Sequence, residues 1–95
     1  MTYYSVGIPV IDASVKQFSF STNILAAAWQ FTFRWMDTYW ALFVDVPSGT
    51  RRPAGVYPNA KSWTGYGDYT VEFVTDKPVI GATELPYCDL VVGIA

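Results

Sequence analysis

The side chains that most often perform chemistry in proteins are scarce in this 95-residue chain. Histidine is absent, and Cys88 is the only cysteine. The chain therefore lacks the usual base for a serine or cysteine nucleophile and the commonest metal ligand. One cysteine excludes an internal disulfide and a thiolate metal cluster. We expect Cys88 to be a small apolar residue of the last strand.

Eight carboxylates remain as candidates for acid–base chemistry. A close pair could in principle hydrolyse a glycosidic bond. Most of them fall in turn-like segments, where aspartate typically accepts hydrogen bonds from the backbone, and Asp45 and Glu72 lie on predicted polar strand faces. The Gly65-Tyr66-Gly67 segment precedes no helix and is a weak phosphate-loop signal. We predict no catalytic, metal or cofactor site, and a protein that is not an enzyme.

The charged residues indicate which partners to exclude. Six basic and eight acidic residues give a net charge of −2 with no basic run, so we expect no nucleic-acid partner. No apolar run reaches the roughly 18 residues of a membrane span. The first residues lack the basic region of a signal peptide, so we expect synthesis in the cytoplasm.

The composition favours protein contacts. The chain is 52% hydrophobic and 18% aromatic but only 15% charged, whereas an average chain has about 25% charged residues. With so few charges, a small domain exposes apolar patches, and such patches commonly mark interfaces. We therefore expect a protein that assembles with others.

Alternation with a period of two predicts the strands that would carry such a surface. Residues 15–21 alternate around Phe18 and Phe20, and residues 21–23 then suggest a turn. Residues 24–28 could start a helical turn, but five residues are too few to hold one alone. Residues 69–75 and 85–94 alternate in the same way. The apolar chain end is interpreted either as a sheet strand or as a plug for a neighbour's groove, and its candidate interface residues are Leu90, Val92 and Ile94.

The strongest pattern lies between residues 28 and 46 and predicts a hairpin about Asp37-Thr38. In this hairpin the numbers of opposing residues sum to 75, and a slip by one residue would turn every aromatic ring to the polar face. The predicted inward pairs are Trp35 with Trp40, Phe33 with Leu42, Phe31 with Val44, and Trp29 with Val46.

Residues 51–68 show no clean period and contain two prolines and three glycines. We expect one long irregular loop here, with Tyr57, Trp63 and Tyr66 as candidate interface residues. Trp63 either caps one end of the domain or anchors a partner protein. Together the patterns predict a single all-β domain over residues 1–95, a small antiparallel β-barrel or sandwich built on hairpins.

The order of several segments resembles a known family, the cyanophage baseplate plug proteins of contractile tails. The segments are Ile8-Pro9-Val10, Gln17-Phe18-Ser19-Phe20, residues 29–35, residues 39–46 and Ser48-Gly49. The resemblance implies a structural protein of the virion, located in the tail baseplate near the hub, spike and tail tube. It implies self-association in a symmetric ring and no catalytic residue.

Two other functions remain open. Tyr57, Trp63 and Tyr66 could form a stacking surface of a carbohydrate- or receptor-binding domain, although few polar side chains accompany them to fix a sugar's orientation. A small enzyme, or an inhibitor of one, is the other alternative.

Overall fold

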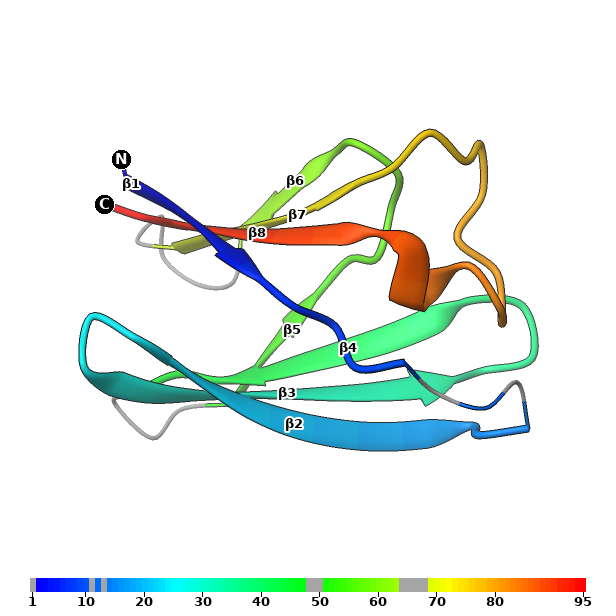
Figure 1. The fold of residues 1–95 in the computed structure, drawn as a ribbon, viewed down its shortest axis with the longest axis horizontal. Coiled ribbons are helices and arrows are strands. Elements are labelled where there is room, and N and C mark those ends of the chain that lie inside the picture. Colours follow the sequence, from blue (N-terminus) through cyan, green and yellow to red (C-terminus); the bar gives the residue numbers. More distant parts are fainter. Residues whose placement is uncertain (1, 11, 13, 48–50, 64–68) are drawn as a thin grey trace.

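The domain is a sandwich of two antiparallel β-sheets (Figure 1). The computed structural model describes residues 2–10, 12, 14–47, 51–63 (for residue 63, the backbone) and 69–95. The strands are β1 (Thr2–Val6), β2 (Gln17–Ile24), β3 (Ala27–Trp35), β4 (Trp40–Asp45), β5 (Arg51–Ala54), β6 (Lys61–Trp63), β7 (Tyr69–Val74) and β8 (Asp89–Ile94), with the short 3-10 helix η1 (Leu85–Tyr87) before β8. No helix among the described residues is long and apolar enough to cross a membrane.

The strands follow one another around the molecule in chain order. One sheet has the order β2-β3-β4-β5 and the other the order β1-β8-β7-β6. Between the sheets, the chain crosses from β1 to β2 and from β5 to β6, and among the described residues no ladder joins either of these pairs. The predicted all-β fold is therefore confirmed as a sandwich, and of the two predicted forms the closed barrel is not formed.

The predicted hairpin is present in the predicted register. Phe31 pairs with Val44, Phe33 with Leu42, and Trp35 with Trp40. Hydrophobic rings of β3 alternate with polar side chains, and burying one face of the sheet selects the register that turns the rings inward. Phe31 and Phe33 are completely buried as a result.

The turn between β2 and β3 differs from the prediction. Residues 21–24 belong to β2, and the turn consists of Leu25 and Ala26, with φ of 53° and 60°. Two successive positive φ values match the twist of a tight two-residue hairpin, which usually contains Asn or Gly. Leu and Ala rarely adopt a positive φ, so the sequence shows no turn signal at these two positions. The helical turn suggested for residues 24–28 is not formed.

The segment expected to be one irregular loop contains two short edge strands. Residues 51–54 pair with β4 as β5, and residues 61–63 pair with β7 as β6. Proline cannot donate to a ladder, so it is confined to positions such as sheet edges, and Pro53 lies in an edge strand. The irregular part among the described residues is 55–60, and residues 64–68 of the predicted loop lie outside the described residues.

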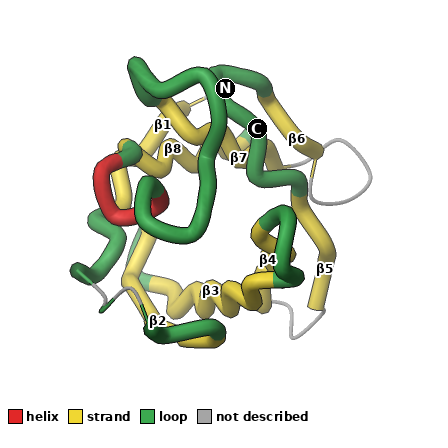
Figure 2. Tube along the Cα trace, turned by 90° about the vertical axis from the view of Figure 1, so that its right-hand side faces the viewer, coloured by secondary structure: helices red, strands yellow, loops and turns green. Residues whose placement is uncertain are grey.

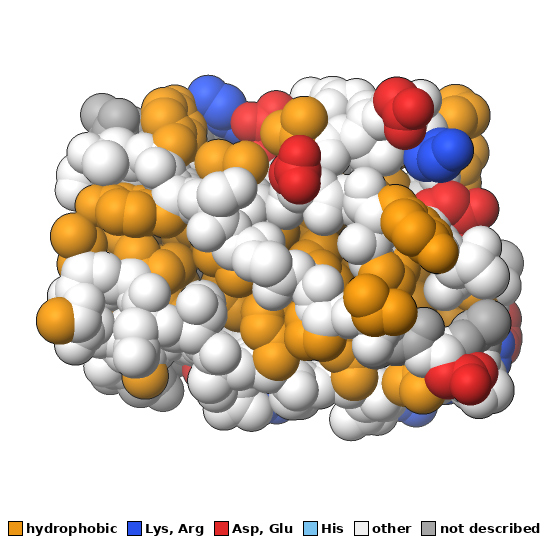
Figure 3. Space-filling view, in the orientation of Figure 1, with side chains coloured by type: hydrophobic (Ala, Val, Ile, Leu, Met, Phe, Trp, Pro, Cys, Tyr) orange, Lys and Arg blue, Asp and Glu red, His pale blue; other side chains and the backbone are white. Residues whose placement is uncertain are grey.

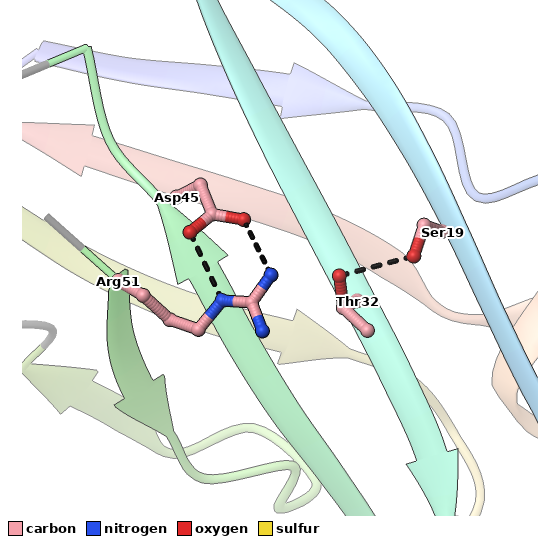
Figure 4. Close-up of polar contacts among 4 residues, drawn as sticks. All are labelled: Ser19, Thr32, Asp45 and Arg51. Carbon is pink, nitrogen blue, oxygen red and sulfur yellow. Dashed lines mark hydrogen bonds and ion pairs between the residues drawn. The ribbon is translucent and has the colours of Figure 1, made fainter. Parts of the chain in front are cut away.

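The core between the sheets is mainly aromatic on one side and aliphatic on the other. Side chains of Phe31, Phe33, Leu42 and Val44 meet those of the opposite sheet. Two threonines, Thr32 and Thr70, are buried as well. A hydrogen bond of 3.0 Å joins the hydroxyl groups of Thr32 and Ser19 on neighbouring strands (Figure 4), which compensates the buried Thr32 hydroxyl.

The end of the chain forms an inner strand. β8 lies between β1 and β7, and Leu90 and Val92 are completely buried. The sheet-strand interpretation of this end is therefore correct. Cys88 is buried immediately before β8 and next to η1.

Candidate functional site

Four connections meet at one end of the sandwich, and this end carries most of the large hydrophobic side chains that are exposed among the described residues. We call this surface the loop end; its described part consists of residues 7–10, 12, 14–16, 36–39, 55–60 and 75–88, with Val74 at the end of β7. It faces the viewer in Figure 2, whereas the N- and C-termini lie at the opposite end in Figure 1. Nine large hydrophobic side chains are exposed among the described residues. Seven of the nine belong to the loop end: Val10, Met36, Tyr39, Tyr57, Val74, Val79 and Tyr87.

The longest connection of the loop end is fixed to the core. Two of its own side chains, Ile80 and Leu85, are buried in the core. The indole Nε1 of Trp40, at the start of β4, donates a hydrogen bond of 2.8 Å to the carbonyl oxygen of Gly81. Indole N–H groups usually find such a partner when buried. These contacts hold the exposed Val79 and Tyr87 in place on a connection of irregular backbone.

A second connection is tied to the end of β7 by Asn59. Its side-chain Nδ2 donates to the carbonyl oxygen of Thr75 at 2.8 Å, and its Oδ1 accepts from the Thr75 N–H at 3.1 Å. The backbone N–H of Asn59 donates to the Phe73 carbonyl oxygen at 2.8 Å. Asn59 has a φ of 56°, a conformation that asparagine tolerates better than most residues. Residues 55–60 are therefore held against the opposite sheet.

An apolar hollow of about 450 Å³ lies between residues 39–43, at the beginning of β4, and residues 53–57, at the end of β5 and the start of the second connection. Tyr39 and Tyr57 both line it, together with apolar side chains such as Leu42, Phe43 and Val56. The ring of Tyr57 lies against Gly55, where any larger residue would meet it. Among the residues that the structure describes, no charged side chain lines the hollow. It is suited to an apolar side chain of another protein.

A larger hollow of about 700 Å³ lies beside residues 76–87. Its lining mixes the hydrophobic side chains of Val10 and Tyr87 with the charged side chains of Asp76, Lys77 and Glu84. The two hollows therefore differ in character, one apolar and one mixed. Interfaces commonly combine both characters, with an apolar centre and a polar rim.

Two carboxylates with lowered pKa values, Asp45 and Asp12, make surface hydrogen bonds. Arg51 donates from Nε and Nη2 to the two carboxylate oxygens of Asp45, at 3.0 and 3.1 Å (Figure 4). This bond lowers the pKa of Asp45 and raises that of Arg51. Hydrogen bonds from the backbone and side chain of Ser14 lower the pKa of Asp12. Both carboxyl groups are therefore ionised at neutral pH and cannot serve there as general acids.

Cys88 and Lys61 also have shifted pKa values. Burial raises the pKa of the Cys88 thiol, which disfavours the nucleophilic thiolate. Hydrogen bonding with the Tyr3 hydroxyl raises the pKa of Lys61. In the described part of the chain, no three Cys, Asp or Glu side chains gather closely enough to hold a metal ion.

The structure separates the six candidate interface residues predicted from the sequence. Tyr57 is 63% exposed and belongs to the loop end. Leu90 and Val92 are 0% exposed, because these positions of β8 face the opposite sheet, so neither side chain offers a surface to a partner. Ile94 is half-buried against the core. Trp63 pairs through its backbone with Thr70, while its side chain and the whole of Tyr66 lie outside the described residues.

The sequence reasoning missed most of the loop end. Tyr39, Val79 and Tyr87 were not among the candidates, although each lies next to a proline, an aspartate or a turn. Connections usually lie on the surface, so large apolar residues beside turn signals are the feature that could have identified them.

Comparison with known proteins finds no matching family model, no curated protein with significant similarity and no solved structure that matches significantly.

Proposed function

We propose that this chain is a structural component of a contractile phage tail baseplate, where it packs in the hub and tail-tube region as a plug or adaptor. Its contribution is protein–protein contact without catalysis. The resemblance of residues 8–49 to the baseplate plug family suggests the location. The concentration of exposed hydrophobic side chains at the loop end carries the proposal of a contact role.

The loop end is suited to this role because it combines apolar area with fixed geometry. Tyr57 and Tyr87 are 63% and 77% exposed, and tyrosine is among the residues that contribute most to interfaces. The connections that carry them are held by Trp40 and Asn59. Fixing an interface loop before binding reduces the entropy lost on association.

In the proposed location the partners are the hub, the spike, the tail tube and further copies of this chain. Tail structures are built from closed rings, in which each copy presents the same surfaces to its neighbours. The chain would be made in the host cytoplasm and would end in the virion. Nucleic acid and membrane are not among the proposed partners.

The experiment that tests this proposal is the composition of purified tails. Tails are isolated from lysates of the phage that encodes this chain, and the chain is quantified by mass spectrometry relative to the hub protein. We expect a fixed ratio of small integers that persists through a second purification step. Absence from tails, or an amount that varies between preparations, would contradict the proposal.

The alternative of a carbohydrate- or receptor-binding domain has one observation in its favour. The rings of Tyr39 and Tyr57 border the same hollow, as stacking residues of a sugar site often do. In the described part of the chain, no side-chain carboxylate, amide or guanidinium group lines that hollow to bind sugar hydroxyl groups. Binding to a glycan array that is lost on Tyr57→Ala would favour this alternative over the baseplate role.

A further inference from the structure

The side of the sandwich between β1 and β2 is open. Both are edge strands of their sheets, and no ladder joins them in the part of the chain that the structure describes. Figure 3 views the molecule from this side, and hydrophobic side chains form a band across it between the two sheets. Four half-buried side chains of this region pack against the core: Tyr4, Ile8, Phe18 and Phe20. We call this region the open side.

The edge of β2 lacks the features that usually prevent pairing with another chain. It runs for eight residues, Gln17–Ile24, without a charge or a proline. By contrast, β5 has Arg51, Arg52 and Pro53, and β6 has three residues including a lysine. Charges, prolines and short length are the common ways of blunting an edge strand. The edges of β5 and β6 are thus protected, and the long edge of β2 is not.

The backbone of β2 has its free hydrogen-bonding groups on alternate residues. The Trp35 N–H donates to the Lys16 carbonyl oxygen at 2.7 Å, so this pair is a hydrogen-bonded pair of the β2–β3 ladder. Because such pairs alternate along an antiparallel ladder, the even-numbered residues of β2 bond to β3. Its odd-numbered residues direct their N–H and C=O groups toward the free edge: Gln17, Ser19, Ser21 and Asn23.

This edge is complementary to itself. An antiparallel copy placed with Phe20 on a two-fold axis puts Ser19 opposite Ser21 of the second copy, and Gln17 opposite Asn23 of the second copy. All four are odd-numbered, so both strands present their free groups to each other. Phe20 then faces Phe20 of the second copy, in a non-hydrogen-bonded pair where side chains lie closest. No charge opposes a like charge, since β2 has none.

We propose that β2 of a second copy adds to this edge in the register described, so that two β2–β5 sheets form one continuous sheet. A two-fold contact requires a surface that is complementary to itself, and β2 meets this requirement in sequence, charge and backbone direction. Pairing also places the partner's sheet beside the apolar band of the open side. This inference rests on the assembly role proposed above. The partner is a second copy of this chain, and the surface is the edge of β2, which is distinct from the loop end.

The test is sedimentation equilibrium of the purified full chain and of two double variants. We expect the unmodified chain to sediment as a dimer of twice its 10.6 kDa mass. Gln17→Lys with Asn23→Lys places lysines opposite each other at both ends of the paired region, and we expect dimerisation on the order of tenfold weaker. Gln17→Lys with Asn23→Glu places opposite charges at the same positions, and we expect the dimer to persist. Both positions are exposed in the single chain, so circular dichroism of the variants is expected to be unchanged.

A backbone variant provides an independent check. Ser21→Pro removes an N–H that points to the free edge and leaves the bonds to β3 intact. We expect a folded monomer.

The outcomes separate this inference from the proposed function. A chain that stays monomeric at high concentration, or a dimer that the two-lysine variant leaves equally tight, would overturn β2 pairing, while the composition of tails would still decide the baseplate role. Equal weakening of both double variants would overturn the register. A dimer that depends on β2 in a chain absent from tails would support the pairing and contradict the baseplate role.

Discussion

The two sheets of this sandwich are assembled from the chain in different ways. In the β2-β3-β4-β5 sheet, every pair of neighbours is consecutive in sequence, and the first two connections are short. In the β1-β8-β7-β6 sheet, the first strand of the chain pairs with the last, so that Thr2 lies opposite Ile94. Figure 1 shows the two termini side by side as a consequence.

The sheets also contribute differently to the core. Stacked rings line the first sheet, with Phe18 and Phe33 5.1 Å apart and Phe20 and Phe31 5.4 Å apart between ring centroids. The second sheet contributes mainly valine and leucine side chains. The ring of Phe73 crosses the core edge-on to Phe33, at 6.0 Å. The locally paired aromatic sheet thus forms one side of the core, and strands from distant parts of the chain pack against it.

Removing the last strand has the largest expected effect. A chain ending at Asp89 loses β8, the strand that pairs with both β1 and β7. The second sheet then consists of pieces without a common neighbour, so we expect loss of the folded domain, measured by circular dichroism and amide dispersion in NMR spectra. A truncated chain that unfolds cooperatively would contradict this dependence on β8. The truncation is consequently unsuitable as a test of binding by Leu90 and Val92.

Core truncations compare the two sheets more finely. Phe33→Ala removes a ring that contacts four others, namely Phe18, Phe20, Trp40 and Phe73. We expect it to lower the free energy of unfolding by about 4 kcal/mol, and Leu90→Ala in the second sheet by about 3 kcal/mol. Urea denaturation measures both, with Val79→Ala at an exposed position as the control. A larger loss for Leu90→Ala would contradict the greater contribution of the aromatic sheet.

The β2–β3 turn offers a gain in stability. Replacing Leu25 and Ala26 by Asn and Gly supplies residues suited to two positive φ values. We expect the free energy of unfolding to rise by about 1 kcal/mol. Thermal denaturation measures it, with Leu25→Ala as a control that leaves the turn strained. A decrease would show that the turn is not of this type.

The smallest expected effect concerns the Asp45–Arg51 ion pair. Because Arg51 lowers the pKa of Asp45 in the folded state, the pair stabilises the fold above the ordinary aspartate pKa of about 4. This stabilisation is lost as the pH falls through the lowered pKa of the folded state.

Asp45→Asn therefore lowers stability slightly at pH 7 and has a diminishing effect as the pH approaches 3. Urea denaturation of both proteins across this range measures the difference. At 1 M salt we expect the difference at pH 7 to shrink, because the pair is exposed. A difference that grows toward low pH would contradict the sign of the pKa shift.

The pairing between consecutive strands could be predicted from the sequence, whereas the pairing between distant strands could not. The β3–β4 register followed from alternating rings, because only one register buries all of them. Nothing in the sequence indicates that β1 pairs with β8, because long-range pairing leaves no local pattern. The Leu25-Ala26 turn was missed because its residues are not those that its backbone favours.

The proposed contact surface was predicted only in part. The composition indicated an excess of apolar residues, and Tyr57, a predicted interface residue, is exposed. The rest of the loop end depends on which connections meet at the same end of the sandwich, as Tyr39 and Tyr87 do. Leu90 and Val92 were misassigned because an apolar strand within a sheet and an apolar tail look alike in sequence.

In the proposed function, the exposed rings of the loop end hold this chain in an assembly. The most direct test is incorporation into tails of a variant in which Tyr39 and Tyr57 are both replaced by serine, compared with Leu25→Ser, which removes an exposed hydrophobic side chain at the opposite end. We predict that the tyrosine variant is folded but largely absent from purified tails, whereas Leu25→Ser is incorporated normally. Incorporation of the tyrosine variant at the level of the unmodified chain would contradict the claim.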